Sequence, residues 1–172
     1  MKGTTWLVLV LALAGVCWGS TLAAQEEEEG NQAAVAKAVM SARVSLERGL
    51  VASASHGQPI SAKFELEEGK LQLSVYTAKG GKFFEVVVDH TSGTVVKAEP
   101  ITEGEDLTAA QSQIAALAKA QRSLRAAVEQ ALRGNAGSRA VSVTPSLKDG
   151  RAVADVTLAK GEQVTTVSVP LQ

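Results

Sequence analysis

Hydrophobic and polar residues alternate in two separate stretches of the chain, and each stretch predicts an antiparallel sheet. In the first, Ile60, Ala62, Phe64 and Leu66 share one face of an extended segment, and the residues between them are polar or charged. Hairpin turns are predicted at Glu68-Gly69 and at Lys79-Gly80-Gly81. Further strands are predicted at Leu71–Tyr76, Phe83–Val88 and Thr94–Ala98. The third strand is apolar on both sides, so we expect it to be central or covered.

The second stretch repeats this arrangement near the end of the sequence. Its strands are predicted at Val141–Leu147, Ala152–Leu158 and Val167–Val169, with the hairpin turn Asp149-Gly150 between the first two. It has three strands and no fourth.

Each sheet segment follows a segment with apolar residues at helical spacing. Val35, Val39, Ala42, Leu46 and Leu50 predict one helix that starts at an Asn31 cap and ends near His56-Gly57. Ile114, Leu117, Leu124, Val128 and Ala131 predict a second, which starts at a capping box, Thr108–Gln111, and ends at Gly134-Asn135.

Residue identities connect the two halves as an internal repeat. In the helical segments, Ala34–Ala38 returns as Ala116–Ala120, and Ser41, Arg43, Glu47 and Leu50 return at the same offset as Ser123, Arg125, Glu129 and Leu132. In the strands, Leu66–Lys70 returns as Leu147–Arg151 and Ala78–Gly80 as Ala159–Gly161. This offset is smaller by one, which suggests that a single residue was lost within the second copy. The repeat predicts two copies of one small unit rather than one large domain.

The sequence therefore predicts an α+β fold of two tandem units, each a helix packed on one face of an antiparallel meander. The predicted organisation is a signal peptide (1–24), an acidic spacer (25–32), unit 1 (33–99), a linker (100–107) and a shortened unit 2 (108–172). In unit 2, Ala152 and Ala154 replace Leu71 and Leu73. Its own core would be thin, so we expect it to share apolar surface with unit 1.

The segment 1–24 has the pattern of a secretory signal. Lys2 precedes an apolar run, Trp6–Val16, that is short for a membrane span, and cleavage after Ala23 or Ala24 suits the small residues there. An uncleaved anchor is one alternative. Lipidation at Cys17 is another, which Val16 disfavours because the preceding position needs a small side chain. We expect a secreted or periplasmic protein of the bacterial envelope.

Composition excludes several classes of function for the mature chain. Cys17 is the only cysteine, so cleavage removes any disulfide, thiolate metal site or cysteine nucleophile. The full sequence has a formal net charge of −1 and 3% aromatic residues, and removal of Lys2 with the signal makes the charge more negative, which argues against nucleic-acid binding and stacking platforms. After the signal no apolar run could span a membrane, so no stable membrane insertion is expected.

Candidate chemistry is sparse. His56 and His90 are the only histidines and lack metal-ligand spacing, and Asp89-His90 with a serine lacks a nucleophile elbow. We therefore predict no catalytic, cofactor-binding or metal-binding residues, and no enzyme. Asp89, Ser92 and Gly93 fit a turn held by the aspartate side chain, with a recognition loop as the alternative.

The first unit resembles the PepSY family. Its Val88–Val95 segment is similar to the family's valine-aspartate turn with serine-glycine and then valine, and the Glu68-Gly69-Lys70 hairpin and Phe84-Glu85-Val86 fit the middle of the pattern. The resemblance covers roughly 33–99, with a divergent second copy over 108–172 that has Pro170-Leu171-Gln172 in place of the turn. It implies a non-catalytic envelope or extracellular module, of a kind proposed to inhibit or regulate secreted peptidases.

The residues and the family resemblance are compatible with two functions. The first is a secreted or periplasmic binding module that modulates an envelope protein, such as a peptidase, by docking or by adding a strand to a sheet edge. Against this, charged residues such as Lys63, Glu65 and Lys160 could simply protect the edges. The second is a structural or sensory envelope protein that binds a small ligand or cell-wall material between the two repeats.

Overall fold

The computed structural model describes residues 30–172, so the predicted signal peptide and most of the acidic spacer lie outside the described residues. The helices are 30–39, α2 (Leu46–Ala52), a 3-10 turn (Ser53–His56), α3 (Gly104–Leu117) and α4 (Leu124–Arg133). The strands are β1 (Gln58–Glu67), β2 (Lys70–Lys79), β3 (Lys82–Val88), β4 (Val95–Ile101), β5 (Arg139–Lys148), β6 (Arg151–Lys160) and β7 (Gln163–Pro170).

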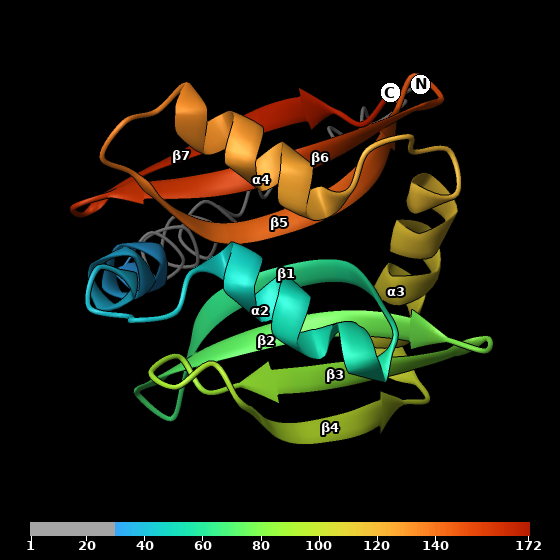
Figure 1. Ribbon diagram of the computed structural model, residues 1–172, viewed down its shortest axis with the longest axis horizontal. Coiled ribbons are helices and arrows are strands. Elements are labelled where there is room, and N and C mark those ends of the chain that lie inside the picture. Colours follow the sequence, from blue (N-terminus) through green and yellow to red (C-terminus); the bar gives the residue numbers. More distant parts are fainter. Residues whose placement is uncertain (1–29) are drawn as a thin grey trace, which may run out of the picture.

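The strands form one antiparallel sheet of seven, in the order β4-β3-β2-β1-β5-β6-β7 (Figure 1). Each unit supplies a meander, and the first strands of the two meanders, β1 and β5, join them. The predicted α+β fold is confirmed, as are the expected hairpins and a third strand that pairs with a neighbour on both sides. The joining of the two meanders into a single sheet goes beyond the prediction.

The two units are related by an approximate two-fold axis between β1 and β5. Ala62 pairs with Val143, which is its counterpart at the offset of the strand repeat. A bulge interrupts β1 between Pro59 and Ser61, and another interrupts β5 at the equivalent place. Counterparts that face each other across an antiparallel pair require a local two-fold relationship.

One hydrophobic core runs through both units. Helices α2 and α4 lie side by side over the same face of the sheet (Figure 1). Leu46, Leu73 and Val75 from unit 1 belong to the same buried cluster as Val128, Val143 and Val156 from unit 2. This confirms that unit 2, whose inner face carries the smaller Ala152 and Ala154, shares its core with unit 1.

The prediction of one long helix per unit is wrong, because each is broken into two. Helix 30–39 ends before a turn, and Ser45 starts α2 by accepting a hydrogen bond from the N–H of Arg48 (3.4 Å). Likewise α3 ends at Leu117, and Ser123 caps α4 through the N–H of Ala126 (3.2 Å). A serine side chain at such a position satisfies an otherwise unpaired N–H at the helix start.

The predicted repeat alignment is also one helical turn out of register in the helices. Ser45 corresponds to Ser123, and the bond from the Ser41 N–H to the Ala38 carbonyl corresponds to that from Lys119 to Ala116. The buried residues agree, since Leu46, Gly49, Leu50 and Ser53 match Leu124, Ala127, Val128 and Ala131. The connection between helix and first strand is therefore longer in unit 2 than in unit 1, rather than shorter.

The start of α3 differs from the predicted capping box. The helix begins at Gly104, and Thr108 lies inside it, donating its hydroxyl to the Gly104 carbonyl (3.3 Å). The predicted linker 100–107 thus contains the end of β4 and the first turn of α3. Helix α3 then lies against β1, β2, β5 and β6, bridging the two units.

Candidate functional site

The turn after β3 is held by the Asp89 side chain, as the sequence predicted. Its Oδ1 accepts hydrogen bonds from the backbone N–H groups of Thr91 (3.0 Å) and Ser92 (2.6 Å) and from the Ser92 hydroxyl (2.9 Å). These bonds, led by the one from the Ser92 N–H, lower the pKa of Asp89. Gly93 has φ +79°, which a residue with a side chain rarely adopts.

This turn also positions the helices of unit 1. The His90 carbonyl accepts hydrogen bonds from the backbone N–H groups of Arg43 and Val44, both at 3.0 Å. Those two residues form the break between helix 30–39 and α2. The geometry thus gives this turn a structural role in unit 1, and a recognition loop stays an alternative.

The two histidines do not come together. His56 ends the 3-10 turn, where Lys79 Nζ of β2 reaches the neighbouring Ser55 carbonyl (3.5 Å), whereas His90 follows the far end of β3. The seven residues of β3 span about 20 Å at roughly 3.3 Å per residue, so both side chains cannot bind one metal ion. The Ser92 hydroxyl contacts Asp89 and Thr94, not His90, so the geometry has no triad-like relay.

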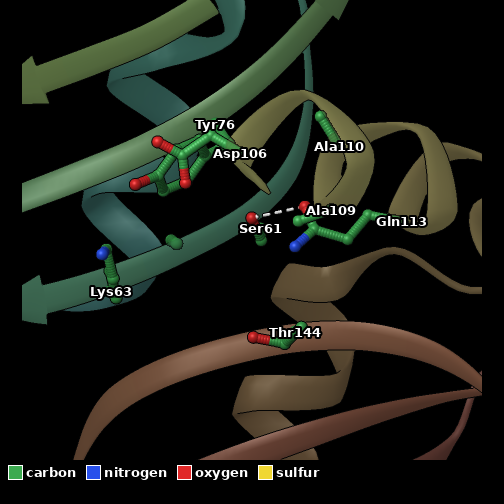
Figure 2. A pocket seen from close by; sticks show the side chains of 9 residues that line it. Ser61, Lys63, Tyr76, Asp106, Ala109, Ala110, Gln113 and Thr144 are labelled. Atoms are coloured by element: carbon green, nitrogen blue, oxygen red, sulfur yellow. Dashed lines mark hydrogen bonds between the residues drawn. The ribbon is translucent and has the colours of Figure 1, made fainter. Parts of the chain in front are cut away.

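A small cavity of about 140 Å³ lies where α3 crosses the polar face of the sheet (Figure 2). Ser61 of β1 is buried there and donates its hydroxyl to Gln113 Oε1 of α3 at 2.8 Å. Asp106 lies beside Tyr76 at one side of the cavity, and Thr144 lies across from them. The arrangement fixes α3 to the sheet and presents no nucleophile paired with a base.

Beside this cavity, a charged network covers the polar face of the first unit. Lys63 Nζ lies 2.6 Å from Glu65 Oε2 and 5.7 Å from the centre of the Tyr76 ring. Burial raises the pKa of Tyr76 to about 12, although the Lys63 charge opposes this. Burial is the largest single influence on Lys63 and lowers its pKa, but the hydrogen bond to Glu65 and the charges of Tyr76 and Glu65 together outweigh it, so the pKa of Lys63 is raised.

Buried Ser74 lies between two carboxylates in the same network. Its hydroxyl is 2.8 Å from Glu65 Oε1 and 2.8 Å from Glu85 Oε1, and it accepts a hydrogen bond from the Gln72 amide (2.9 Å). A hydroxyl has one proton, so it donates to one carboxylate at a time. These groups cross-link strands β1, β2 and β3.

The expectation that Lys63, Glu65 and Lys160 protect sheet edges is wrong. Lys63 and Glu65 lie on β1, which pairs with strands on both sides, and Lys160 ends β6, which is also internal. Sequence alone could not show this, because β1 becomes central only through its pairing with β5.

The edges of the described sheet are β4 and β7, and they differ in character. Strand β4 carries Lys97, Glu99 and Pro100, the residue types that discourage another chain from pairing with an edge. Strand β7, whose sequence is QVTTVSVP, has no charged residue. It corresponds to β3 of unit 1, whose outer side is covered by β4.

Alternate residues of β7 direct their backbone N–H and C=O groups towards the open edge of the sheet. The Leu171 N–H donates to the Ala152 carbonyl of β6 (3.0 Å), so residue 171 faces inward. Because backbone groups alternate along a strand, those of Val164, Thr166 and Ser168 face the open edge. Pro170 also faces outward. Because proline has no backbone N–H, its outward position costs no hydrogen bond with β6.

Two further structural findings apply to residues 30–172. No helix in this part of the chain has both the length and the apolar character needed to cross a membrane. Nor do three or more His, Cys, Asp or Glu side chains gather there in a group that could hold a metal ion. The predictions of no catalytic, cofactor-binding or metal-binding residues stay predictions.

Comparisons with known proteins assign neither a family nor a function to this chain. No protein-family profile matches the sequence, and no curated protein matches it. Among solved structures, the crystal structure of a "putative lipoprotein" from Clostridium difficile is similar over 66% of this chain and 75% of its own, with 12% sequence identity and a TM-score of 0.41. The resemblance to the PepSY family therefore remains a hypothesis.

Proposed function

We propose that this protein is a secreted or periplasmic, non-catalytic binding module that docks onto another envelope protein and modulates it. The observation that carries the proposal is the open, uncharged edge of β7. Natural sheets guard exposed edges with charge or proline, as β4 does here, because unpaired N–H and C=O groups recruit other strands. Because β7 has no charged residue and its one proline lies at its end, its outward groups favour a partner that adds an extended segment along Val164–Ser168.

The pseudo-symmetry supports this docking mode. In unit 1, β4 pairs along β3 from Phe83↔Ile101 to Val88↔Val95, with a register shift at the end of β3. The equivalent side of β7 presents the backbone groups of Val164, Thr166 and Ser168, of which Val164 and Thr166 are β-branched. A partner segment on β7 would extend the sheet with β4-like pairing. Backbone hydrogen bonds would supply affinity, and alternate side chains would supply specificity.

The identity of the partner is suggested by the family resemblance, which points to secreted peptidases. A peptidase bound through β7 would be modulated by occlusion, with this protein acting stoichiometrically and without turnover. The expected signal sequence would bring this protein to the compartment in which a secreted peptidase acts.

The test is to immobilise the mature chain, residues 25–172, and identify envelope proteins retained after gentle crosslinking. Thr166→Pro removes an outward N–H of β7, and Val96→Lys places a charge on the other edge as a matched control. We expect wild type and Val96→Lys to retain the same partner and Thr166→Pro to lose it, with all three showing cooperative unfolding. Equal retention by a folded Thr166→Pro variant would contradict the β7 mode.

A second measurement addresses modulation. If the retained protein is a peptidase, its activity should fall stoichiometrically as the mature chain is added and should stay unchanged when Thr166→Pro is added instead. Unchanged peptidase activity in the wild-type complex would contradict the proposed inhibition while leaving docking in place.

A further inference from the structure

A groove of about 430 Å³ lies between the two units, beside α2 and the start of α4. Unit 1 contributes residues of α2, the 3-10 turn and the start of β1. Unit 2 contributes the end of α3, the following turn and the start of α4. Its apolar lining residues are Leu50, Val51, Ala54, Pro59, Leu117, Ala120 and Leu124. A volume of this size falls within the range of small-molecule sites.

The approximate two-fold axis shows why the groove is open. The counterpart position lies between α4 and the turn at 40–45, and there Val44 is buried with 3% of its surface exposed. Arg139 reaches across it and donates from Nη2 to the Val44 carbonyl at 3.3 Å. In the groove itself, Arg122 takes the place of Val44 and Gln58 takes the place of Arg139. The Arg139 side chain that crosses the counterpart position is thus replaced by the shorter Gln58 at the groove.

The charged side chains that line the groove are positive. Arg122 is half-buried and Arg125 is exposed, and no acidic residue lines the groove. Arg125 has one ionic contact outside it, with Glu129 at 3.7 Å. The first turn of α4 also has no acidic side chain to offset the positive end of the helix. An anionic group is therefore favoured at this end.

The groove also has an exposed apolar part. Val51 has 56% of its surface accessible, although it lies next to buried Leu50 on a helix that otherwise packs well. An exposed valine that lines a groove, rather than a flat surface, gains from being covered by an apolar ligand. The site thus has an apolar body and a cationic end.

We propose that this groove binds a small amphiphile with one apolar chain and one carboxylate, such as a fatty acid. The chain would lie along Leu50, Val51 and Ala120, and the carboxylate would lie at Arg122 and Arg125. This proposal is independent of docking at β7, because the two sites share no residue.

The test uses dodecanoate as the probe. Its binding to the mature chain is measured by calorimetry, and amide NMR shifts locate the binding site. We expect dodecanoate to bind, with shifts at Val51 and Leu124, and dodecyltrimethylammonium to bind at least about fivefold more weakly. Arg122→Gln and Arg125→Gln should each weaken dodecanoate binding by about fivefold, the scale of a partly exposed charge interaction. Arg133→Gln, at the far end of α4, is the matched control and should have no effect.

Several outcomes would overturn the proposal. These are no dodecanoate binding, equal binding of the cationic probe, equal weakening by Arg133→Gln, or shifts located away from the groove. A peptide with an apolar C-terminal residue is a further arm, and tighter binding of that peptide at the same residues would reject a fatty-acid-like ligand. Ala120→Trp, which fills the groove, should abolish binding in a variant that still unfolds cooperatively, and retained binding would also reject the site.

Discussion

The backbone N–H of Gln121 donates a hydrogen bond to the carbonyl oxygen of Leu171 at 2.7 Å, and the next N–H, of Arg122, reaches the same oxygen at 3.0 Å. In unit 1 the carbonyl of His90, which is the counterpart of Leu171 in the strand repeat, receives the equivalent pair from Arg43 and Val44. The segment that lacks the aspartate-glycine turn therefore still provides the contact that holds the break between two helices.

Replacing Leu171 with alanine is expected to destabilise the protein by about 2–4 kcal/mol, because the Leu171 side chain is fully buried and its loss leaves a cavity. Denaturant unfolding of the mature chain measures this. Gln172→Ala, at an exposed neighbouring residue, is the control and should change stability by less than about 0.5 kcal/mol. Equal stability of Leu171→Ala and wild type would show that the segment after β7 contributes little to the fold.

Gly49→Ala is expected to destabilise the protein by about 1–3 kcal/mol, although alanine normally favours a helix over glycine. A Cβ at this position of α2 would lie 2.6 Å from Leu73 Cδ2 of β2, and Leu73 is fully buried. Thermal unfolding is the measurement. Gly134→Ala provides the comparison, since its Cβ would meet no atom closer than 3.7 Å. If Gly49→Ala were as stable as Gly134→Ala, the close approach of α2 to β2 would be wrong.

Hairpins and strands could be predicted from the sequence because their signals are local. Glu68-Gly69 and Asp149-Gly150 both adopt positive φ at both residues, as their turn chemistry requires. The alternation of apolar and polar residues in β1 and β2 follows from the same short-range pattern. Asp89 and Gly93 belong to this class, since the turn they form closes on itself.

The breaks between the helices cannot be predicted from local sequence signals. An apolar stripe continues across each break, and the carbonyl of His90 that fixes the first break lies far along the chain from Arg43. Ser45 is the available signal, because a serine before an apolar residue is a common helix cap. Chance identities between the two helical segments conceal it, since they align Ser123 with Ser41 instead of Ser45.

The joined sheet and the groove depend on how the two units pack. Nothing in β1 marks it as the partner of β5, so the sequence pattern assigns Lys63 and Glu65 to an edge when they lie at the centre. The groove lies where Gln58 and Arg122 stand in the places of Arg139 and Val44, a comparison that only the two-fold relationship reveals.

Tyr76 is the only tyrosine, so its ionisation can be followed by ultraviolet absorbance without overlap. We expect a midpoint near pH 12 in the folded protein, because burial raises the pKa from 10.0 to about 12. A raised pKa means that this contribution to stability is full below pH 10.0 and is lost as the pH rises towards 12. Lys63→Met should move the midpoint higher, since the lysine charge lowers the Tyr76 pKa, whereas Lys82→Met is the control. A midpoint near 10 with the fold intact would contradict the burial of Tyr76 beside α3.

Protonation of Asp155 is expected to lower the stability of the protein in acid. Burial raises its pKa, but hydrogen bonds from Lys148 Nζ, at 2.8 Å, and from the Ser168 hydroxyl outweigh this and hold the pKa below the ordinary 3.8. Because the folded-state pKa is the lower one, this stabilisation is present above pH 3.8 and is lost as the pH falls through the folded-state value. Asp155→Asn should therefore cost about 1 kcal/mol or less at neutral pH, since the carboxylate is partly exposed.

The measurement for Asp155 is the urea midpoint of wild type and Asp155→Asn between pH 7 and pH 2. The difference between the two should shrink as the pH falls below 3.8, and Lys148→Met should show the same trend because it removes the main donor. Lys160→Met, at the exposed end of β6, controls for the loss of a lysine. A difference that stays constant across this range would mean that Asp155 acts through packing between β6 and β7 rather than through its charge.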